Sequence, residues 1–367
     1  MEKQGSQTIK FNNPPQIISA ASIVGDKESK GPLGEYFDEI ISDGYNNQKT
    51  WEQAQIKMVE DVINNVLKKV KLSEDQIDCL LGGDLLDETI ASNFAARKFP
   101  VPFLGLFGAC STMIEAMAIA AMMIDGGAAN KVISFTSSHY QATERQFRTP
   151  NEYGDKYPPY KQLTVTGAGA TILSNQPGGV QVREATLGKI VDLGVKDPND
   201  MGSAMAPAAA DTILQHLEDT NRSPKEYDLI VTGDLGKVGK SLTLELLSEQ
   251  GCDITKNYDD CGVMIYNSNQ KVGAGGSGCG CSAVVVASYL LPQLMHGNFN
   301  RILVLGTGAL LNPLTYLQGE SIPCIAHAVT LEGTGHLSEG IGRPSIRDNL
   351  ATKIEVPRIE DLTGSEG

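Results

Sequence analysis

GACSTMIEAMAIAAMMID, residues 108–125, places a cysteine and two hydroxyl side chains immediately before a run of alanine, methionine and isoleucine. Glu115 is the only charged residue before Asp125, so the pattern predicts a helix that is buried on most of its faces. A helix of this kind lies inside a protein. The chain, with 367 residues and 41% apolar content, is long enough to cover it with one large core or two smaller ones.

The region around this predicted helix is repeated later in the chain. SEDQIDCLLGGDL at 73–85 corresponds to SPKEYDLIVTGDL at 223–235, and Cys110-Ser111 with its apolar run corresponds to Cys281-Ser282 with a similar run. The same order of features at nearly constant spacing favours a duplicated βαβ-type unit. Chance similarity between short apolar strands is the alternative.

Individual elements agree with an α/β fold. Thr50 is predicted to cap a helix whose apolar residues recur at helical spacing up to Val70, and short apolar strands are predicted at 79–81, 131–135 and 301–305. We therefore predict an N-terminal half at 1–175 and a C-terminal half at 176–331. Residues 332–367 are rich in glycine and charge, and we predict a tail outside the core.

Composition narrows the class of function. The net charge of −14 and the pI near 4.8 argue against nucleic acid as a partner, because phosphate recognition needs a concentrated basic surface. The seven cysteines are scattered, without the spacing of zinc or redox pairs, so free thiols are expected. The glycine-rich segment 273–278 lacks the Lys-Ser/Thr of a phosphate loop. We predict no metal and no cofactor.

Several strings together resemble the stage V sporulation protein AD family within the thiolase-like superfamily. They are ASNFAARKFPVP (91–102), GLFGACST (105–112), TSSH (136–139), ERQFR (144–148), EYG (152–154), TVTGAG (164–169) and GTGA (306–309), the last resembling the late glycine-rich turn of that superfamily. The resemblance covers roughly residues 15–331 and implies a thiolase fold, with duplicated βαβαβ halves in five αβαβα layers and mixed sheets.

The resemblance also implies a function. Members of this family are expected to bind dipicolinic acid, pyridine-2,6-dicarboxylate, as the free acid or as its calcium chelate, and to support its uptake into the developing spore. Membrane-bound spore transport proteins are the implied partners, and a homodimer is implied by the superfamily. The expected location is the cytoplasmic side, either free or held at a spore membrane through partners.

Cys110 is the candidate reactive residue. A cysteine at a helix N-terminus faces free backbone N–H groups and the positive end of the helix dipole, both of which favour the thiolate. The alternative is a small buried residue without a chemical role. By resemblance, condensing enzymes add a histidine and a histidine or asparagine from the second half, but Gly233 and Cys279 occupy those two positions here. Efficient condensation is therefore not expected.

The remaining candidate ligand-binding residues are Ser92, Thr136, His139, Arg145 and Gly278. His139 follows a predicted strand and is expected to reach a ligand carboxylate, with a surface or core histidine as the alternative. Arg145 offers the bidentate geometry that a carboxylate prefers. It belongs to a polar loop at 140–162, predicted to be a lid, with Arg148, Lys156 and Lys161.

Two functions remain open from the sequence, and a third reading, a structural scaffold that docks to membrane proteins, is compatible with either. The first is a largely non-catalytic binder of dipicolinate. The second is an acyltransferase or ketoacyl synthase-like enzyme that uses Cys110 as its nucleophile. His216 is predicted to lie on an exposed helix face, whereas His327 and Cys324 are assigned to structure.

Overall fold

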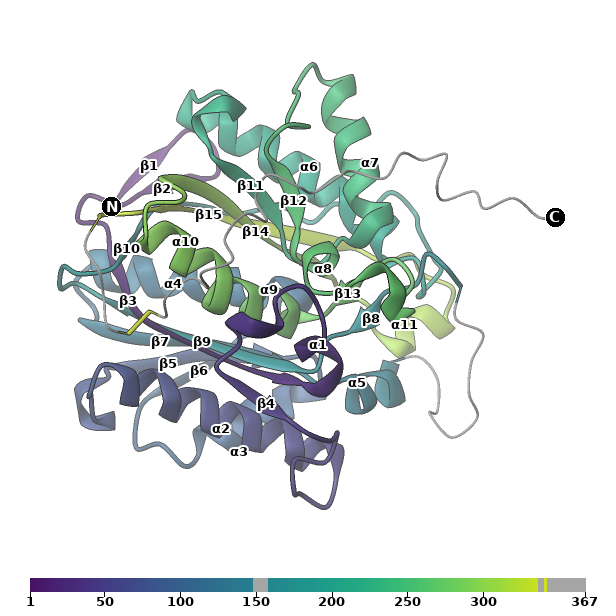
Figure 1. Cartoon of the computed structure of the whole chain (residues 1–367). Helices are drawn as coiled ribbons and strands as arrows, with labels where there is room; N and C mark the ends of the chain where they lie inside the picture. Colours follow the sequence, from purple (N-terminus) through teal and green to yellow (C-terminus); the bar gives the residue numbers. More distant parts are fainter. Residues whose placement is uncertain (148–157, 336–339, 342–367) are drawn as a thin grey trace.

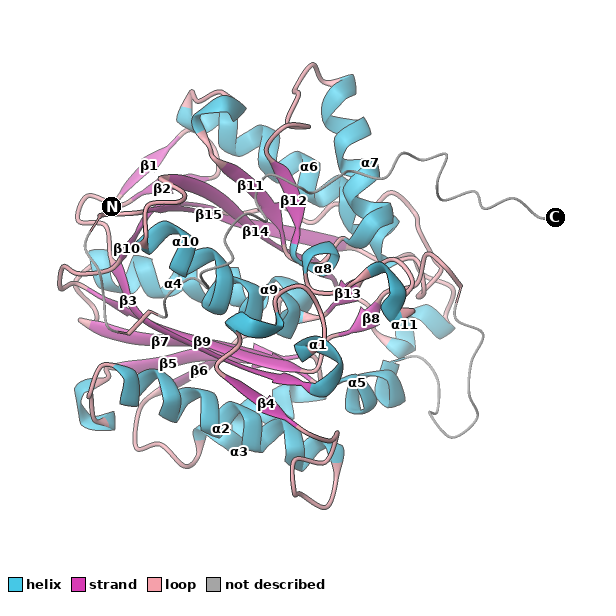
Figure 2. Cartoon of the chain, viewed as in Figure 1, coloured by secondary structure: helices cyan, strands magenta, loops and turns pink. Residues whose placement is uncertain are grey.

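The computed structural model describes residues 1–147, 158–335 and 340–341. Two similar α/β halves are stacked, so that helices, a sheet, helices, a sheet and helices follow one another in five layers (Figure 1). The strands are mixed parallel and antiparallel in both sheets (Figure 2). The α/β class and the five-layer arrangement predicted from the sequence are confirmed.

The first half forms the lower sheet of Figure 1, in the order β3-β9-β7-β5-β6, with β4 beside β3. Its strands are β3 (Gln16–Gly25), β4 (Glu39–Ile41), β5 (Cys79–Asp84), β6 (Phe103–Gly105), β7 (Lys131–Ser138) and β9 (Gly167–Ser174). Helices α2 (Trp51–Lys69) and α3 (Ile90–Ala96) cover its outer face. Thr50 caps α2 as predicted, because its hydroxyl accepts a hydrogen bond from the backbone N–H of Gln53.

The second half forms the upper sheet, in the order β12-β11-β14-β15-β10, with β2 and β1 beyond β10. Its strands are β1 (Glu2–Gln4), β2 (Thr8–Lys10), β10 (Val180–Thr186), β11 (Leu229–Thr232), β12 (Tyr258–Asp260), β14 (Arg301–Ala309) and β15 (Cys324–Glu332). Helices α6 (Met201–Thr220) and α7 (Gly236–Glu249) cover its outer face. A short antiparallel contact between β10 and β3 joins the two sheets.

Shorter elements lie around the edge where the halves meet. They are α1 (Asp26–Ser29), α5 (Tyr140–Phe147), α8 (Cys261–Met264), α11 (Pro313–Leu317) and the two-stranded pair β8 (Leu163–Thr164) and β13 (Gly276–Ser277).

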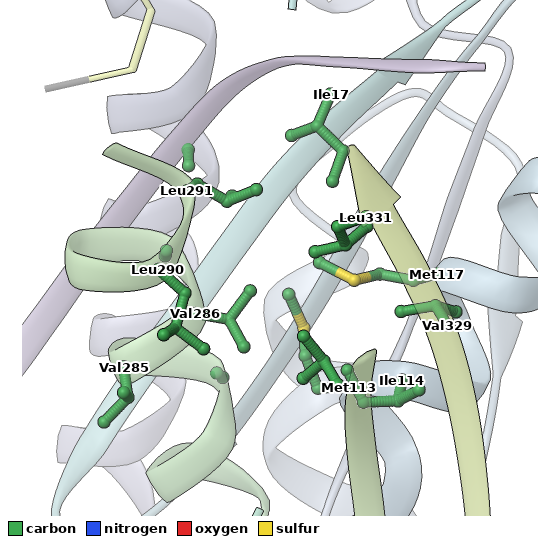
Figure 3. Close-up of a cluster of buried hydrophobic side chains, with 14 of the residues drawn as sticks. Ile17, Met113, Ile114, Met117, Val285, Val286, Leu290, Leu291, Val329 and Leu331 are labelled. Carbon is green, nitrogen blue, oxygen red and sulfur yellow. The ribbon is translucent and has the colours of Figure 1, made fainter. Parts of the chain in front are cut away.

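The central layer consists of α4 (Thr112–Asp125) and of α9 (Cys279–Val285), which continues through a π-turn into α10 (Leu291–Met295). Figure 3 shows Met113 and Met117 of α4 between side chains of α9–α10 and Val329 and Leu331 of β15. α4 is buried as its composition predicted, since both sheets enclose it.

The duplication extends to a hydrogen-bonding detail that ties two strands together. Asp78 Oδ2 accepts from the backbone N–H groups of Asn130 (2.6 Å) and Lys131 (2.9 Å), where β7 begins. Asp228 Oδ2 accepts from those of Asn300 (2.6 Å) and Arg301 (3.0 Å), where β14 begins. The repeated aspartate therefore fixes the same strand start in each half.

The segment 306–309, likened above to a glycine-rich turn, is part of strand β14. Its glycines are required by a close approach to the turn that carries Cys110. A Cβ on Gly306 would lie 2.7 Å from the Ser111 carbonyl oxygen, and one on Gly308 would lie 2.4 Å from that of Gly108. At both contacts the backbone of β14 packs directly against the backbone of the Cys110 turn, so there is no room for a side chain at Gly306 or Gly308.

Both chain ends depart from the predicted division. β1 and β2 belong to the N-terminal half by sequence, yet they extend the sheet of the second half through β10. The tail is not wholly outside the core: Ile341 is buried, and the Gly340 carbonyl accepts from the Ala20 N–H at 3.1 Å. A single apolar residue has no periodicity, so the sequence did not reveal this contact. The predicted boundary at 175/176 falls in the turn between β9 and β10.

Candidate functional site

Cys110 lies in a 3₁₀ turn, Ala109–Ser111, that leads directly into α4. Ala109 adopts φ +50°, a left-handed conformation that non-glycine residues rarely adopt. The Ser111 hydroxyl donates to the Gly108 carbonyl (2.7 Å) and the Thr112 hydroxyl to the Ala109 carbonyl (2.7 Å), which hold the turn. Strained backbone of this kind persists where the surroundings fix it, and it is frequent at functional sites.

The carboxylate of Asp234, from the second half, contacts the thiol of Cys110. The carboxylate is buried, and Cys110 donates a hydrogen bond to it. Asp234 Oδ1 also accepts from the Thr307 hydroxyl (2.7 Å), and Oδ2 accepts from the Gly278 N–H (2.8 Å). Thr307 lies on β14 and Gly278 lies immediately before α9, so two segments of the second half fix this carboxylate.

The environment favours the thiol form of Cys110. Burial raises the pKa of Cys110 well above its usual value, and the Asp234 charge raises it further, whereas a hydrogen bond from the Gly278 backbone opposes them. A helix N-terminus was expected to favour the thiolate, but desolvation and a neighbouring carboxylate act in the opposite direction. Burial also raises the pKa of Asp234.

The two substituted positions identified from the sequence contribute no side-chain donor for an oxyanion. Gly233 has no side chain, and a Cβ there would lie 3.2 Å from both the Leu305 carbonyl oxygen and Ser282 Cβ. The Cys279 thiol donates to the Ser137 carbonyl at 3.1 Å, and burial raises its pKa well above its usual value. Neither position supplies the histidine or asparagine that condensation uses.

A narrow pocket of about 40 Å³ opens onto Cys110. Its walls are mainly apolar, with three hydroxyl groups; the lining residues are Leu85, Phe107, Ala109, Cys110, Thr143, Phe147, Thr164, Met201, Ser277, Ala309 and Leu311. The volume holds one or two water molecules, so a larger ligand requires side chains to move. Phe107 is 49% exposed and Phe147 is the last residue of α5, so we expect these two rings to be the movable walls.

No charged residue is among the described residues that line the pocket, but an ion pair lies behind it. The Thr164 hydroxyl donates to Glu144 Oε1 (3.1 Å), and Lys161 Nζ lies 3.5 Å from Glu144 Oε2. Both charged side chains are almost fully buried. Thr164, which lines the pocket, is therefore hydrogen-bonded directly to the buried Glu144–Lys161 ion pair.

Among the six residues predicted to bind a ligand, Cys110 alone lines this pocket. Thr136 is buried and donates to the Cys279 carbonyl (3.0 Å), and the Ser92 hydroxyl donates to Asp84 Oδ2 (2.7 Å). Gly278 adopts φ +99° and gives its N–H to Asp234. These three residues lie behind the pocket and build its support.

His139 and Arg145 are engaged elsewhere. His139 is fully buried, its Nε2 bonds the Gly44 carbonyl (2.8 Å), and burial lowers its pKa to about 4, so the ring is neutral at pH 7. Arg145 pairs with Glu52 and lies over the ring of Trp51. The segment predicted as a polar loop instead begins with helix α5, which carries Arg145. Arg148 and Lys156, also assigned to the lid, lie outside the described residues.

His216 was predicted on an exposed helix face, and this is wrong. The side chain is fully buried, with Nδ1 bonded to Thr186 (2.7 Å) and Nε2 to Tyr227 (2.7 Å). His327 is structural as predicted, because its Nδ1 accepts from the Gly188 N–H (3.1 Å).

Asp234 is the site residue that the sequence argument missed. The signal was present, since Gly233-Asp234-Leu235 repeats Gly83-Asp84-Leu85 and Asp234 directly follows the position of the absent histidine. Asp84 of the first half is also buried and binds Ser92.

The fold, with a cysteine turn at the buried helix between two duplicated halves, defines a thiolase-like protein. Three solved condensing-enzyme structures share it. The tetronic acid condensing enzyme AbyA1 gives a TM-score of 0.54 at 17% identity over 87% of this chain and 100% of its own. The synthase III FabH from Xanthomonas oryzae pv. oryzae KACC10331 gives a TM-score of 0.54 at 16% sequence identity, over 88% of this chain and 100% of its own. Xanthomonas campestris OleA gives a TM-score of 0.55 at 16% identity, also over 88% of this chain and 100% of its own. These likenesses concern the fold alone.

The chain belongs to the stage V sporulation protein AD family. The family model of that name matches residues 5–332. Stage V sporulation protein AD of Bacillus subtilis (strain 168) is 49% identical over 338 residues, which cover 92% of this chain and 100% of that protein. The resemblance inferred from the sequence is confirmed, and the chain is a sporulation protein. No helix in the described part of the chain is long and apolar enough to cross a bilayer.

Proposed function

We propose that the chain binds dipicolinic acid in the pocket beside Cys110 and supports its uptake into the developing spore without converting it. The observation that carries the proposal is the Asp234 carboxylate at the thiol, where a condensing enzyme needs a donor. Apolar walls such as Leu85 and Phe147 suit a flat aromatic ring. Family membership supports the same ligand.

Titration calorimetry with dipicolinate is expected to show saturable binding, and benzoate of similar shape is expected to bind much more weakly. Ala309→Phe should abolish dipicolinate binding, because Ala309 lines the pocket and a phenyl ring there would occupy the space that the ligand needs. Ala309→Ser is the matched control and should bind normally. Titrations with and without calcium separate the free acid from its chelate.

Equal or undetectable heats for dipicolinate and benzoate would contradict the proposal. So would unchanged dipicolinate affinity in a folded Ala309→Phe variant, since the ligand would then lie elsewhere.

Acyl transfer through Cys110 is the second candidate function, supported by the strained turn and the position of the thiol. Incubation with a panel of acyl-CoA thioesters, followed by intact mass measurement, separates the two functions. A mass increase that is lost in Cys110→Ala favours acyl transfer, and no increase favours binding alone.

The homodimer is proposed to form through the exposed edge of β6. This strand ends the sheet, so its outer backbone groups have no strand partner in the described chain, and Leu104 and Phe107 are about half exposed beside it. Pairing with a second β6 would bury these side chains. Phe107 also lines the Cys110 pocket, so a dimer would cover one of the pocket's movable walls.

Leu104→Asp is expected to convert the dimer to a monomer in size-exclusion chromatography with light scattering, because it places a charge in an apolar contact. Ile40→Asp is the matched control, since Ile40 is 50% exposed on β4, which pairs with β3 and is separated from β6 by β3, β9, β7 and β5. A wild-type monomer at micromolar concentration, or a Leu104→Asp dimer, would exclude the β6 interface.

The proposed role in dipicolinate uptake includes docking to membrane-bound spore proteins at the cytoplasmic side of a spore membrane.

A further inference from the structure

A second cavity, of about 360 Å³, lies apart from the Cys110 pocket and shares none of its described lining residues. Four segments enclose it: the end of β3 with α1, the loop after β4, the start of α5 and the segment around β8. Its lining residues are Gly25, Asp26, Lys27, Glu28, Ile41, Ser42, Asp43, Gly44, Tyr140, Gln141, Leu163 and Thr166. Helix α5 separates the two pockets, since Tyr140 and Gln141 face one and Thr143 and Phe147 face the other.

The most unusual group in this cavity is the carboxylate of Glu28, which is 2% exposed. Oε1 accepts from the Tyr266 hydroxyl and from the Thr166 N–H (3.2 Å). No other described residue donates a hydrogen bond to Oε2, although Glu28 lines the cavity. A Cβ on Gly25 would lie 2.6 Å from Oε2, so the glycine leaves room for this oxygen.

Glu28 forms no ion pair with a described residue, although the charge of the neighbouring Lys27 lowers its pKa. Burial raises the pKa of Glu28, and the hydrogen bonds from Tyr266 and Thr166 offset this only in part. Lys27 lines the same cavity but forms no ion pair with Glu28 in the described chain, and the neighbouring Asp26 is paired with Lys30 (2.5 Å). A buried carboxylate is costly unless a cation compensates for its lost hydration, so a cationic ligand would relieve this cost.

We propose that this cavity binds a small organic cation, with Oε2 of Glu28 accepting a hydrogen bond from its ammonium group. The rim adds the carboxylate of Asp43, whereas that of Asp26 is already paired with Lys30, and the net charge of −14 attracts cations to the surface. The volume matches a small organic molecule. A bare metal ion fits poorly, because no group of three His, Cys, Asp or Glu side chains in the described residues could hold one.

Calorimetric titration with n-butylammonium tests the site, with butyrate as the probe of equal size and opposite charge. The wild-type protein should bind butylammonium saturably and butyrate not at all. Glu28→Gln should weaken butylammonium binding by about tenfold or more, because a charge-assisted hydrogen bond is lost. Glu39→Gln, which changes an exposed glutamate on β4 outside the cavity, is the matched control.

Gly44→Ala provides a second variant in case Glu28→Gln does not fold. Its Cβ would lie 3.2 Å from the flexible end of Gln141, so it narrows the cavity without touching Glu28 and should also weaken binding. Cys110→Ala should leave butylammonium affinity unchanged, which separates this site from the dipicolinate pocket. Equal binding of butylammonium and butyrate, no saturable binding, or full affinity in folded Glu28→Gln would overturn the proposal.

Discussion

Asp234→Asn is expected to make Cys110 react with iodoacetamide about tenfold faster at neutral pH, or more. The carboxylate accepts the thiol proton and opposes the thiolate, so its removal lowers the pKa of Cys110. Each unit by which the pKa falls raises the thiolate fraction about tenfold while the thiol form dominates. A time course of intact mass measures the rate, and Cys110→Ala identifies the adduct.

Asp84→Asn is the matched control for this experiment. Asp84 is also a buried carboxyl at the equivalent point of the repeat, but it binds Ser92 and is not among the charges that act on Cys110. The control should alkylate at the wild-type rate. If Asp234→Asn reacts no faster than wild type, burial alone keeps Cys110 protonated and the carboxylate has no part in it.

Asp234 also bears on the acyl-transfer chemistry proposed as the second candidate for Cys110. In acyl transfer a base must take the thiol proton and donors must stabilise an oxyanion. Asp234 is instead occupied by Thr307 and the Gly278 N–H, and Gly233 and Cys279 offer no side-chain donor for an oxyanion. The site is therefore better suited to contact a ligand than to attack it.

Met117→Ala is expected to lower the free energy of unfolding by about 2–5 kcal/mol, the range for truncating a buried methionine. Met117 is fully buried in the central layer, between side chains of α9–α10 and of β15 (Figure 3). Two sheets hold this layer, so the cavity cannot close by a simple shift of one helix. Urea unfolding followed by circular dichroism measures the effect.

Met117→Leu is the volume-conserving control and should cost less than about 1.5 kcal/mol. Leu317→Ala, at a side chain 78% exposed on α11, should change stability by no more than about 0.5 kcal/mol. A loss in Met117→Ala no larger than that in Leu317→Ala would show that the central layer repacks freely, contrary to its enclosure by both sheets.

Local and periodic features could be predicted from the sequence because they depend on neighbouring residues. The buried helix after Cys110, the Thr50 cap and the strands that became β5, β7 and β14 follow from hydrophobic pattern and capping chemistry. The duplication was also visible, since Asp78 and Asp228 perform the same task in both halves. Together with the family strings, these features fixed the fold class.

Contacts between distant segments were decided only by the tertiary structure. Asp234 lies beside Cys110, 124 positions away in the sequence, because the two halves of the fold meet there. Burial and the Asp234 charge raise the pKa of the thiol, against the effect of the helix terminus. His216 is buried, and its ring nitrogens are hydrogen-bonded to Thr186 and Tyr227. Arg145 forms an ion pair with Glu52. The sequence by itself determined the elements and the presence of a cysteine site. The protonation state of that site, and which polar residues face it, depend on desolvation and on charges brought together by folding, and neither can be read from local pattern.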